Sequence, residues 1–89
     1  MDVPEGWTLE ESGKALLRTY TFKDFNEAFG FLTRVALYAE RMDHHPEIRN
    51  VWNRVDFRLW THDSGGITAR DEELADAINE IGTTFGVQR

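Results

Sequence analysis

The chain has 89 residues, of which 40% are hydrophobic, enough for one domain with a packed core that buries roughly 60–65% of its unfolded surface. Sixteen acidic and ten basic side chains give a net charge of −6, which disfavours binding to nucleic acid or an anionic membrane because both require a basic surface. The chain has no cysteine, which excludes thiol chemistry, disulfides and thiolate metal sites.

The first seven residues, MDVPEGW, lack the apolar core of a signal peptide. No stretch of the sequence approaches the roughly 20 apolar residues that a membrane span requires. We therefore expect a cytoplasmic protein in which residues 1–89 form a single domain.

Residues 7–22 predict two strands joined by a turn near residues 12–14, where a glycine tolerates the positive φ of a tight turn. In the second strand, Leu16, Tyr20 and Phe22 fall on the same face. This period of two is typical of a strand with one buried face.

Residues 23–42 have the period of an amphipathic helix, with apolar positions every three or four residues. The predicted buried stripe consists of Phe25, Phe29, Leu32, Val35 or Ala36, and Ala39. Asp24 followed by Glu27 resembles a capping box at the start of the helix, although Thr21 is an alternative cap. The helix should end before Pro46, because a proline disfavours helical geometry at the residue before it.

Residues 47–61 could be mistaken for one long strand. At roughly 3.3 Å per residue, such a strand would place His62 about 55 Å from His45. A chain of this length has a radius of gyration of only about 12 Å, so a single straight strand hardly fits. The segment must therefore reverse its direction.

We expect a hairpin with strands near residues 48–52 and 55–61, and a reversal at Asn53 and Arg54, because Asn readily accepts left-handed turn conformations. The residues predicted to face the core in the second strand are Val55, Phe57 and Leu59. The hairpin would return His62 to the end where the preceding helix stops.

A final helix is predicted to follow Thr68, with Asp71 as the acidic partner of an N-terminal cap. Its apolar stripe consists of Leu74, Ala75, Ile78 and Ile81. The predicted order is thus β-β-α-β-β-α, an α+β fold with a four-stranded antiparallel sheet and helices packed on one face.

All three histidines lie in residues 42–66. Histidine exchanges protons near neutrality because its unperturbed pKa is about 6.5. His44 and His45 follow a helix C-terminus, whose partial negative charge favours the imidazolium. The Glu40 carboxylate, one turn before His44, would act in the same direction if the two side chains meet.

The residues alone leave three interpretations open for these histidines. In the first, the histidines are polar residues at the end of a helix and the end of a strand, and they take part in no reaction. The second is a metal site of three histidines with Glu40 or Asp63, although the compact helical His pair of many metal sites is missing. The third is metal-free acid–base catalysis on a neutral substrate.

The segments ERMDHHPE, NVWNRV and THDSGGITARD strongly resemble the pterin-4a-carbinolamine dehydratases. The resemblance covers roughly residues 6–81. The family pattern of an acidic residue, His-His-Pro, an aromatic residue, a later His and a final Asp falls on Glu40, His44, His45, Pro46, Trp52, His62 and Asp71. Two positions depart from the usual pattern, since Ile48 replaces a frequent aromatic residue and Trp60 a smaller one.

The resemblance implies an enzyme that converts 4a-hydroxytetrahydrobiopterin to quinonoid dihydropterin and water in tetrahydropterin recycling, with neither metal nor cofactor. It also implies a homodimer or homotetramer. An alternative function, likewise implied by the family, is a protein-interaction module that acts as a dimerisation cofactor of a transcription regulator.

The resemblance assigns roles to particular side chains. His44 and His62 would be the general acid and base, and His45 would bind the pterin. Glu40 and Asp71 would hold the imidazoles in orientation and charge through hydrogen bonds. The remaining candidates for binding the substrate are Trp7 and Trp52, which could stack on the flat ring, although core packing is the alternative for both.

Overall fold

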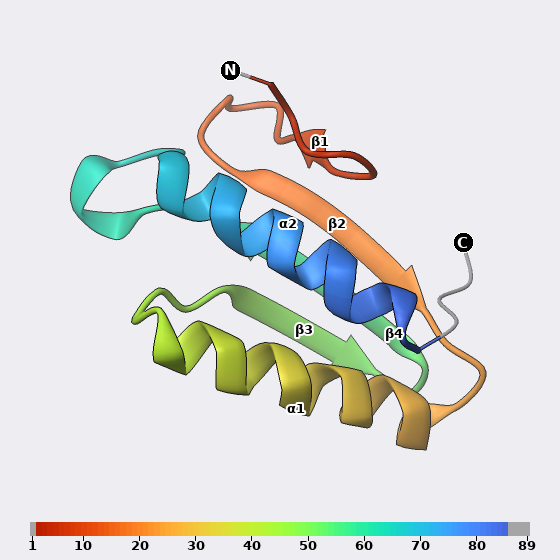
Figure 1. Ribbon diagram of the computed structural model, residues 1–89. Coiled ribbons are helices and arrows are strands. Elements are labelled where there is room, and N and C mark those ends of the chain that lie inside the picture. The colour runs from red at the N-terminus through yellow and green to blue at the C-terminus, as the bar shows by residue number, and fades with distance from the viewer. Residues whose placement is uncertain (1, 86–89) are drawn as a thin grey trace.

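The computed structural model describes residues 2–85, and its elements follow the predicted order β-β-α-β-β-α. They are β1 (Thr8–Leu9), β2 (Leu16–Thr21), α1 (Phe25–Arg41), β3 (Glu47–Val51), β4 (Arg54–Leu59), the short 3₁₀ helix η1 (His62–Ser64) and α2 (Ala69–Thr83). The four strands form an antiparallel sheet in the order β1-β2-β4-β3, and both helices cover the same face of it (Figure 1). The predicted fold class is confirmed.

The centre of the sheet is the pair formed by β2 and β4, in which Leu16 lies opposite Leu59 and Tyr20 opposite Val55. Val55, Phe57 and Leu59 are all buried, as the alternation of apolar and polar residues in β4 predicts. Because β2 and β4 carry apolar side chains on the same face, both helices have a continuous surface to pack against.

The buried stripe of α1 differs from the prediction. It consists of Ala28, Phe31, Leu32, Val35 and Ala39. Phe25 and Phe29, which we expected in the core, are 49% and 54% exposed. The helix carries two overlapping apolar stripes, and Phe31 takes the core position because its ring packs against those of Tyr20 and Phe22, with centroids 4.9 and 4.8 Å apart.

The turn between β3 and β4 lies one residue earlier than predicted. Trp52 and Asn53 form the turn, and it is Trp52, with φ of 48°, that takes the left-handed conformation expected of Asn53. Asn53 instead bonds to the end of β2, because its side chain donates to the Phe22 carbonyl at 2.7 Å and its own carbonyl accepts from the Phe22 N–H at 2.9 Å.

The sheet face away from the helices is polar. Arg58 on β4 donates to Glu10 at 2.7 and 3.0 Å and to Glu47 at 3.1 Å. Hydrogen bonds from Arg58 and Ser12 lower the pKa of Glu10 from 4.5 to about 2. This face of the sheet therefore carries paired charges, whereas the opposite face packs against the helices and forms the core.

One end of the molecule brings together segments that are distant in sequence. The C-terminus of α1, the start of β3, the loop after β4 and the N-terminus of α2 meet at the left of Figure 1, while the turn between β3 and β4 lies at the opposite end. No helix within residues 2–85 has the length and apolar character needed to cross a membrane.

Candidate active site

The end of α1 is shaped so that His44 leaves the helix at a sharp angle. The His44 N–H donates to the Ala39 carbonyl and the Asp43 N–H to the Glu40 carbonyl, both at 3.1 Å. Asp43 has φ of 53°. These bonds and the left-handed residue form a Schellman motif, which usually has glycine where Asp43 stands. The motif turns the chain back toward the molecule at His44, which is only 9% exposed.

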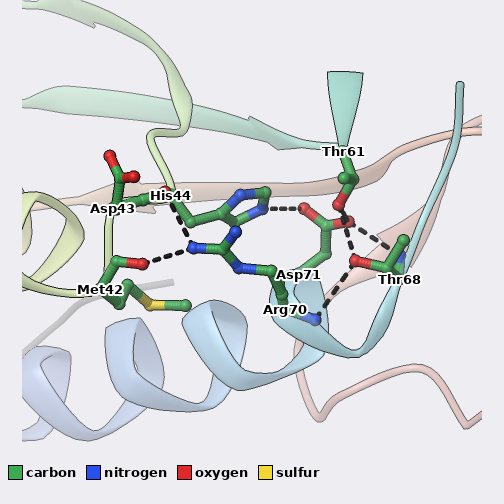
Figure 2. A network of polar contacts seen from close by, with 7 residues as sticks. All are labelled: Met42, Asp43, His44, Thr61, Thr68, Arg70 and Asp71. Carbon is green, nitrogen blue, oxygen red and sulfur yellow. Dashed lines mark hydrogen bonds and ion pairs between the residues drawn. The ribbon is translucent and has the colours of Figure 1, made fainter. Parts of the chain in front are cut away.

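Asp71, in the first turn of α2, binds the His44 side chain. Its carboxylate is fully buried and accepts from His44 Nε2 at 2.7 Å, from Thr61 Oγ1 at 2.7 Å and from the Thr68 N–H at 2.9 Å (Figure 2). The predicted cap is confirmed, since Thr68 is the N-cap and Asp71 completes a capping box.

This contact determines which nitrogen of His44 can exchange a proton. An ionised carboxylate only accepts hydrogen bonds, so Nε2 must carry the hydrogen that points at Asp71. Nδ1 has no hydrogen-bond partner within residues 2–85, and no buried side-chain polar atom in this range lacks one. Nδ1 is therefore the nitrogen that solvent or a ligand can reach, as a base in the neutral ring and as an acid in the imidazolium.

His45 has a different environment although it is the next residue. His45 is exposed, whereas His44 is buried. Its Nε2 lies 2.8 Å from Glu40 Oε1, and the two side chains are 57% and 79% exposed. Glu40 thus pairs with His45 and not with His44, the imidazole we expected its carboxylate to influence.

His62 reaches the same end of the molecule from β4. It follows Thr61, which shares the Asp71 carboxylate with His44. The predicted return of the hairpin to the end of α1 is therefore confirmed. The His62 residue is exposed, and its ring lies 5.2 Å from the Trp60 ring between centroids.

The structure does not bring the two predicted tryptophans to the histidines. Trp7 is only 5% exposed and lies in the core, where its Nε1 donates to Asn79 Oδ1 at 2.8 Å. This position agrees with the alternative role, which was core packing. Trp52 is 63% exposed at the turn that ends β3. That turn lies about 23 Å along the chain from His45, at roughly 3.3 Å per residue.

Sequence reasoning missed two residues of this site. Thr61 joins the Asp71 carboxylate, and the Arg70 side chain donates to the carbonyls of Met42 and Asp43, the latter at 2.8 Å (Figure 2). One signal was available for Arg70. The first turn of a helix favours acidic residues, so an arginine there indicates a specific partner outside the helix.

Within the part of the chain that the structure describes, no three His, Asp or Glu side chains converge closely enough to hold a metal ion. What the arrangement offers is a buried carboxylate that orients one imidazole, with an exposed imidazole–carboxylate pair and a third imidazole at the same end. Such a set can give and take protons.

Comparison with known proteins gives a consistent result. Residues 1–81 match the model of the family described as pterin 4 alpha carbinolamine dehydratase. Two relatives share the name "Putative pterin-4-alpha-carbinolamine dehydratase". The one from Afipia carboxidovorans is 58% identical over 82 residues, which are 92% of this chain and 82% of that protein. The one from Rhodopseudomonas palustris (strain BisB18) is 60% identical over 76 residues, which are 85% and 75%.

Solved structures agree with these sequence matches. The transcriptional coactivator/pterin dehydratase from Brucella melitensis has a TM-score of 0.84 at 47% identity and covers 86% of this chain and 82% of its own. A pterin dehydratase-like protein, identified as a RuBisCO assembly factor in the alpha-carboxysome, shares the fold with a TM-score of 0.74 at 16% identity, over 90% of this chain and 93% of its own. By the match over most of its length and by its relatives, the chain belongs to the pterin 4 alpha carbinolamine dehydratase family.

Proposed function

We propose that this protein dehydrates a 4a-hydroxytetrahydropterin, such as 4a-hydroxytetrahydrobiopterin, to the quinonoid dihydropterin and water, as a step of tetrahydropterin recycling. Family membership supports the substrate class. The observation that supports the chemistry best is the buried contact of 2.7 Å between His44 Nε2 and Asp71, which leaves Nδ1 as the working nitrogen. Buried carboxylates commonly orient a histidine that transfers protons.

The reaction takes up one proton and releases one proton. The 4a-hydroxyl takes up one proton, the C–O bond breaks with help from the ring nitrogen electrons, and water leaves. A ring N–H then loses one proton as the new C=N bond forms. Since one proton is delivered and one is removed, an imidazolium and a neutral imidazole are sufficient, and no redox, metal or covalent step is needed.

We assign these two roles to His44 and His62. His44 is buried and oriented by Asp71, whereas His62 is exposed to solvent. A positioned general acid or base typically contributes about 10²–10⁴-fold to the rate. A small site with two such groups can therefore supply the proton transfers that this reaction needs.

His45 is assigned to binding the pterin ring, with its orientation held by Glu40. The pair lies at the surface beside the buried dyad, where a ligand can reach it. Even a charged pair of exposed side chains contributes only about 0–1 kcal/mol to stability, so loss of this contact should affect binding more than folding.

The test is steady-state turnover of freshly generated 4a-hydroxypterin, followed by ultraviolet absorbance. His44→Ala and His62→Ala should each lower kcat at least about tenfold, and His45→Ala should mainly raise KM. Arg34→Ala is the matched control, because Arg34 lies exposed on α1 and makes no ion pair within residues 2–85. Wild-type turnover by both histidine variants would exclude these side chains from the chemistry.

A second candidate function is a protein-interaction module that serves as a dimerisation cofactor of a transcription regulator. It is supported by apolar side chains exposed on α1, with Phe25 49%, Phe29 54% and Leu37 65% exposed. The Brucella melitensis relative also carries the name transcriptional coactivator. An inactive wild-type protein that binds a regulator would favour this function over dehydration.

The same side chains support self-association as a homodimer or homotetramer, since a soluble protein rarely exposes grouped apolar side chains without a partner. Phe25 and Phe29 pack against each other, with ring centroids 5.5 Å apart. Sedimentation velocity of the wild type and of a Phe29→Ser variant would measure the oligomeric state.

A further inference from the structure

Arg70 connects the two elements that carry the His44–Asp71 contact. It belongs to the first turn of α2, next to Asp71 in sequence, yet its guanidinium reaches across to the end of α1. There one terminal nitrogen donates to the carbonyl of Met42 and, at 2.8 Å, to that of Asp43 (Figure 2).

The two carbonyls held by Arg70 precede His44 directly. Met42 is the C-cap of α1 and Asp43 the residue after it, so neither carbonyl has a partner within the helix, and both lie at its negative end. Asp43 must also stay in the left-handed region for His44 to point inward. A guanidinium on these carbonyls therefore holds the segment that determines the direction of the His44 side chain.

The backbone of Arg70 takes part in the other half of the contact. Its N–H donates to Thr68 Oγ1 at 3.3 Å. Thr68 Oγ1 in turn lies 2.7 Å from Thr61 Oγ1, and this second hydroxyl donates to Asp71 Oδ2 at 2.7 Å. Because these bonds use Oδ2, the other carboxylate oxygen of Asp71, Oδ1, accepts the hydrogen bond from His44. One residue thus helps to fix both the imidazole and the carboxylate.

We propose that Arg70 is a positioning residue of this site, whose guanidinium holds the Met42–Asp43 turn and so keeps His44 Nε2 on Asp71 and Nδ1 free for proton transfer. Its expected effect on turnover rests on the proposed function, whereas its effect on the His44 imidazole does not.

The experiment compares Arg70→Met and Arg70→Lys with wild type. Methionine removes both donated bonds. Lysine keeps the positive charge and the N–H donors, but its side chain is shorter by one atom, so it should restore the contact only in part. Arg34→Met is the control, an exposed arginine of α1 with no hydrogen bond or ion pair within the described residues. The first readout is the ring ¹⁵N NMR spectrum, in which three histidines give three resolvable sets of signals.

In wild type and in Arg34→Met, neutral His44 should give the signals of a single Nε2–H tautomer. Arg70→Met should give a mixture of tautomers, and Arg70→Lys an intermediate spectrum. In the turnover assay, Arg70→Met should lower kcat about tenfold, because a small misplacement of a catalytic group is costly, with little change in KM. The same substitution in a His44→Ala background should cause no further loss of kcat, because Arg70 acts through His44.

An unchanged His44 tautomer in Arg70→Met would overturn the proposal, as would an equal loss of kcat in the presence and absence of His44. If Arg70→Met does not fold, Arg70→Lys decides the question with the same two readouts. A wild type without turnover would refute the proposed function instead, and the NMR spectra would still decide whether Arg70 positions His44.

Discussion

Replacing Asp71 with asparagine changes the hydrogen-bonding capacity of the site while keeping its shape. The carboxylate accepts three bonds, from His44 Nε2, Thr61 Oγ1 and the Thr68 N–H. Asparagine offers one accepting oxygen and one donating NH₂ group. If the oxygen serves Thr61 and Thr68, the NH₂ faces Nε2 of His44, and the imidazole must move its hydrogen to Nδ1 to avoid two donors in contact.

The magnitudes follow from this exchange. A hydrogen bond to a charged group contributes about 1.5–3 kcal/mol and an unsatisfied buried donor costs about 1–3 kcal/mol, so the free energy of unfolding should fall by roughly 2–4 kcal/mol. Turnover should fall at least about 100-fold, because a histidine in the wrong tautomer cannot present its base to the substrate.

Urea unfolding measures the first effect and steady-state kinetics the second. Asp76→Asn is the matched control, since Asp76 lies exposed on the same helix and makes no hydrogen bond or ion pair within residues 2–85. The reasoning is refuted if Asp71→Asn keeps wild-type kcat while ring ¹⁵N spectra show His44 still in the Nε2–H tautomer. A stable but inactive Asp71→Asn would refute only the magnitude given for stability.

Two further predictions concern stability. Because the pKa of Glu10 is lowered from 4.5 to about 2, the folded state binds fewer protons than the unfolded state between these values, so this carboxylate stabilises the fold above pH 4.5 and its contribution is lost as the pH falls toward 2. Urea midpoints should therefore depend less on pH in this window in Glu10→Gln, and an unchanged dependence would contradict the ion pair with Arg58. Asp43→Gly should raise the free energy of unfolding by up to about 1 kcal/mol, because glycine adopts the left-handed φ of 53° without strain, whereas Asp43→Val should lower it by about 1–2 kcal/mol. A less stable Asp43→Gly variant in urea unfolding would show that the aspartate side chain has a role of its own.

Local signals in the sequence were sufficient for the order of the elements and for their boundaries to within a few residues. The alternation of Val55, Phe57 and Leu59 identifies a half-buried strand, because side chains of a strand alternate between its faces. Thr68 and Asp71 identify a helix start, because unpaired N–H groups there need acceptors. The histidine pattern also identifies the family, since it is read from residue types and spacing alone.

The pairing of carboxylates with imidazoles was decided by the tertiary structure. Glu40 is near both His44 and His45 in sequence, and only the left-handed turn at Asp43 sends one imidazole inward and the other to Glu40. Asp71 is 27 positions from His44, so only the meeting of α1 and α2 at one end of the sheet could join them.

The same is true of the choice between Phe31 and Phe29 for the core, because both fit a helical period and the rings of Tyr20 and Phe22 select Phe31. Composition and spacing determined which side chains this protein has for its chemistry. Their partners were determined by packing, since a contact between distant segments depends on where whole elements end.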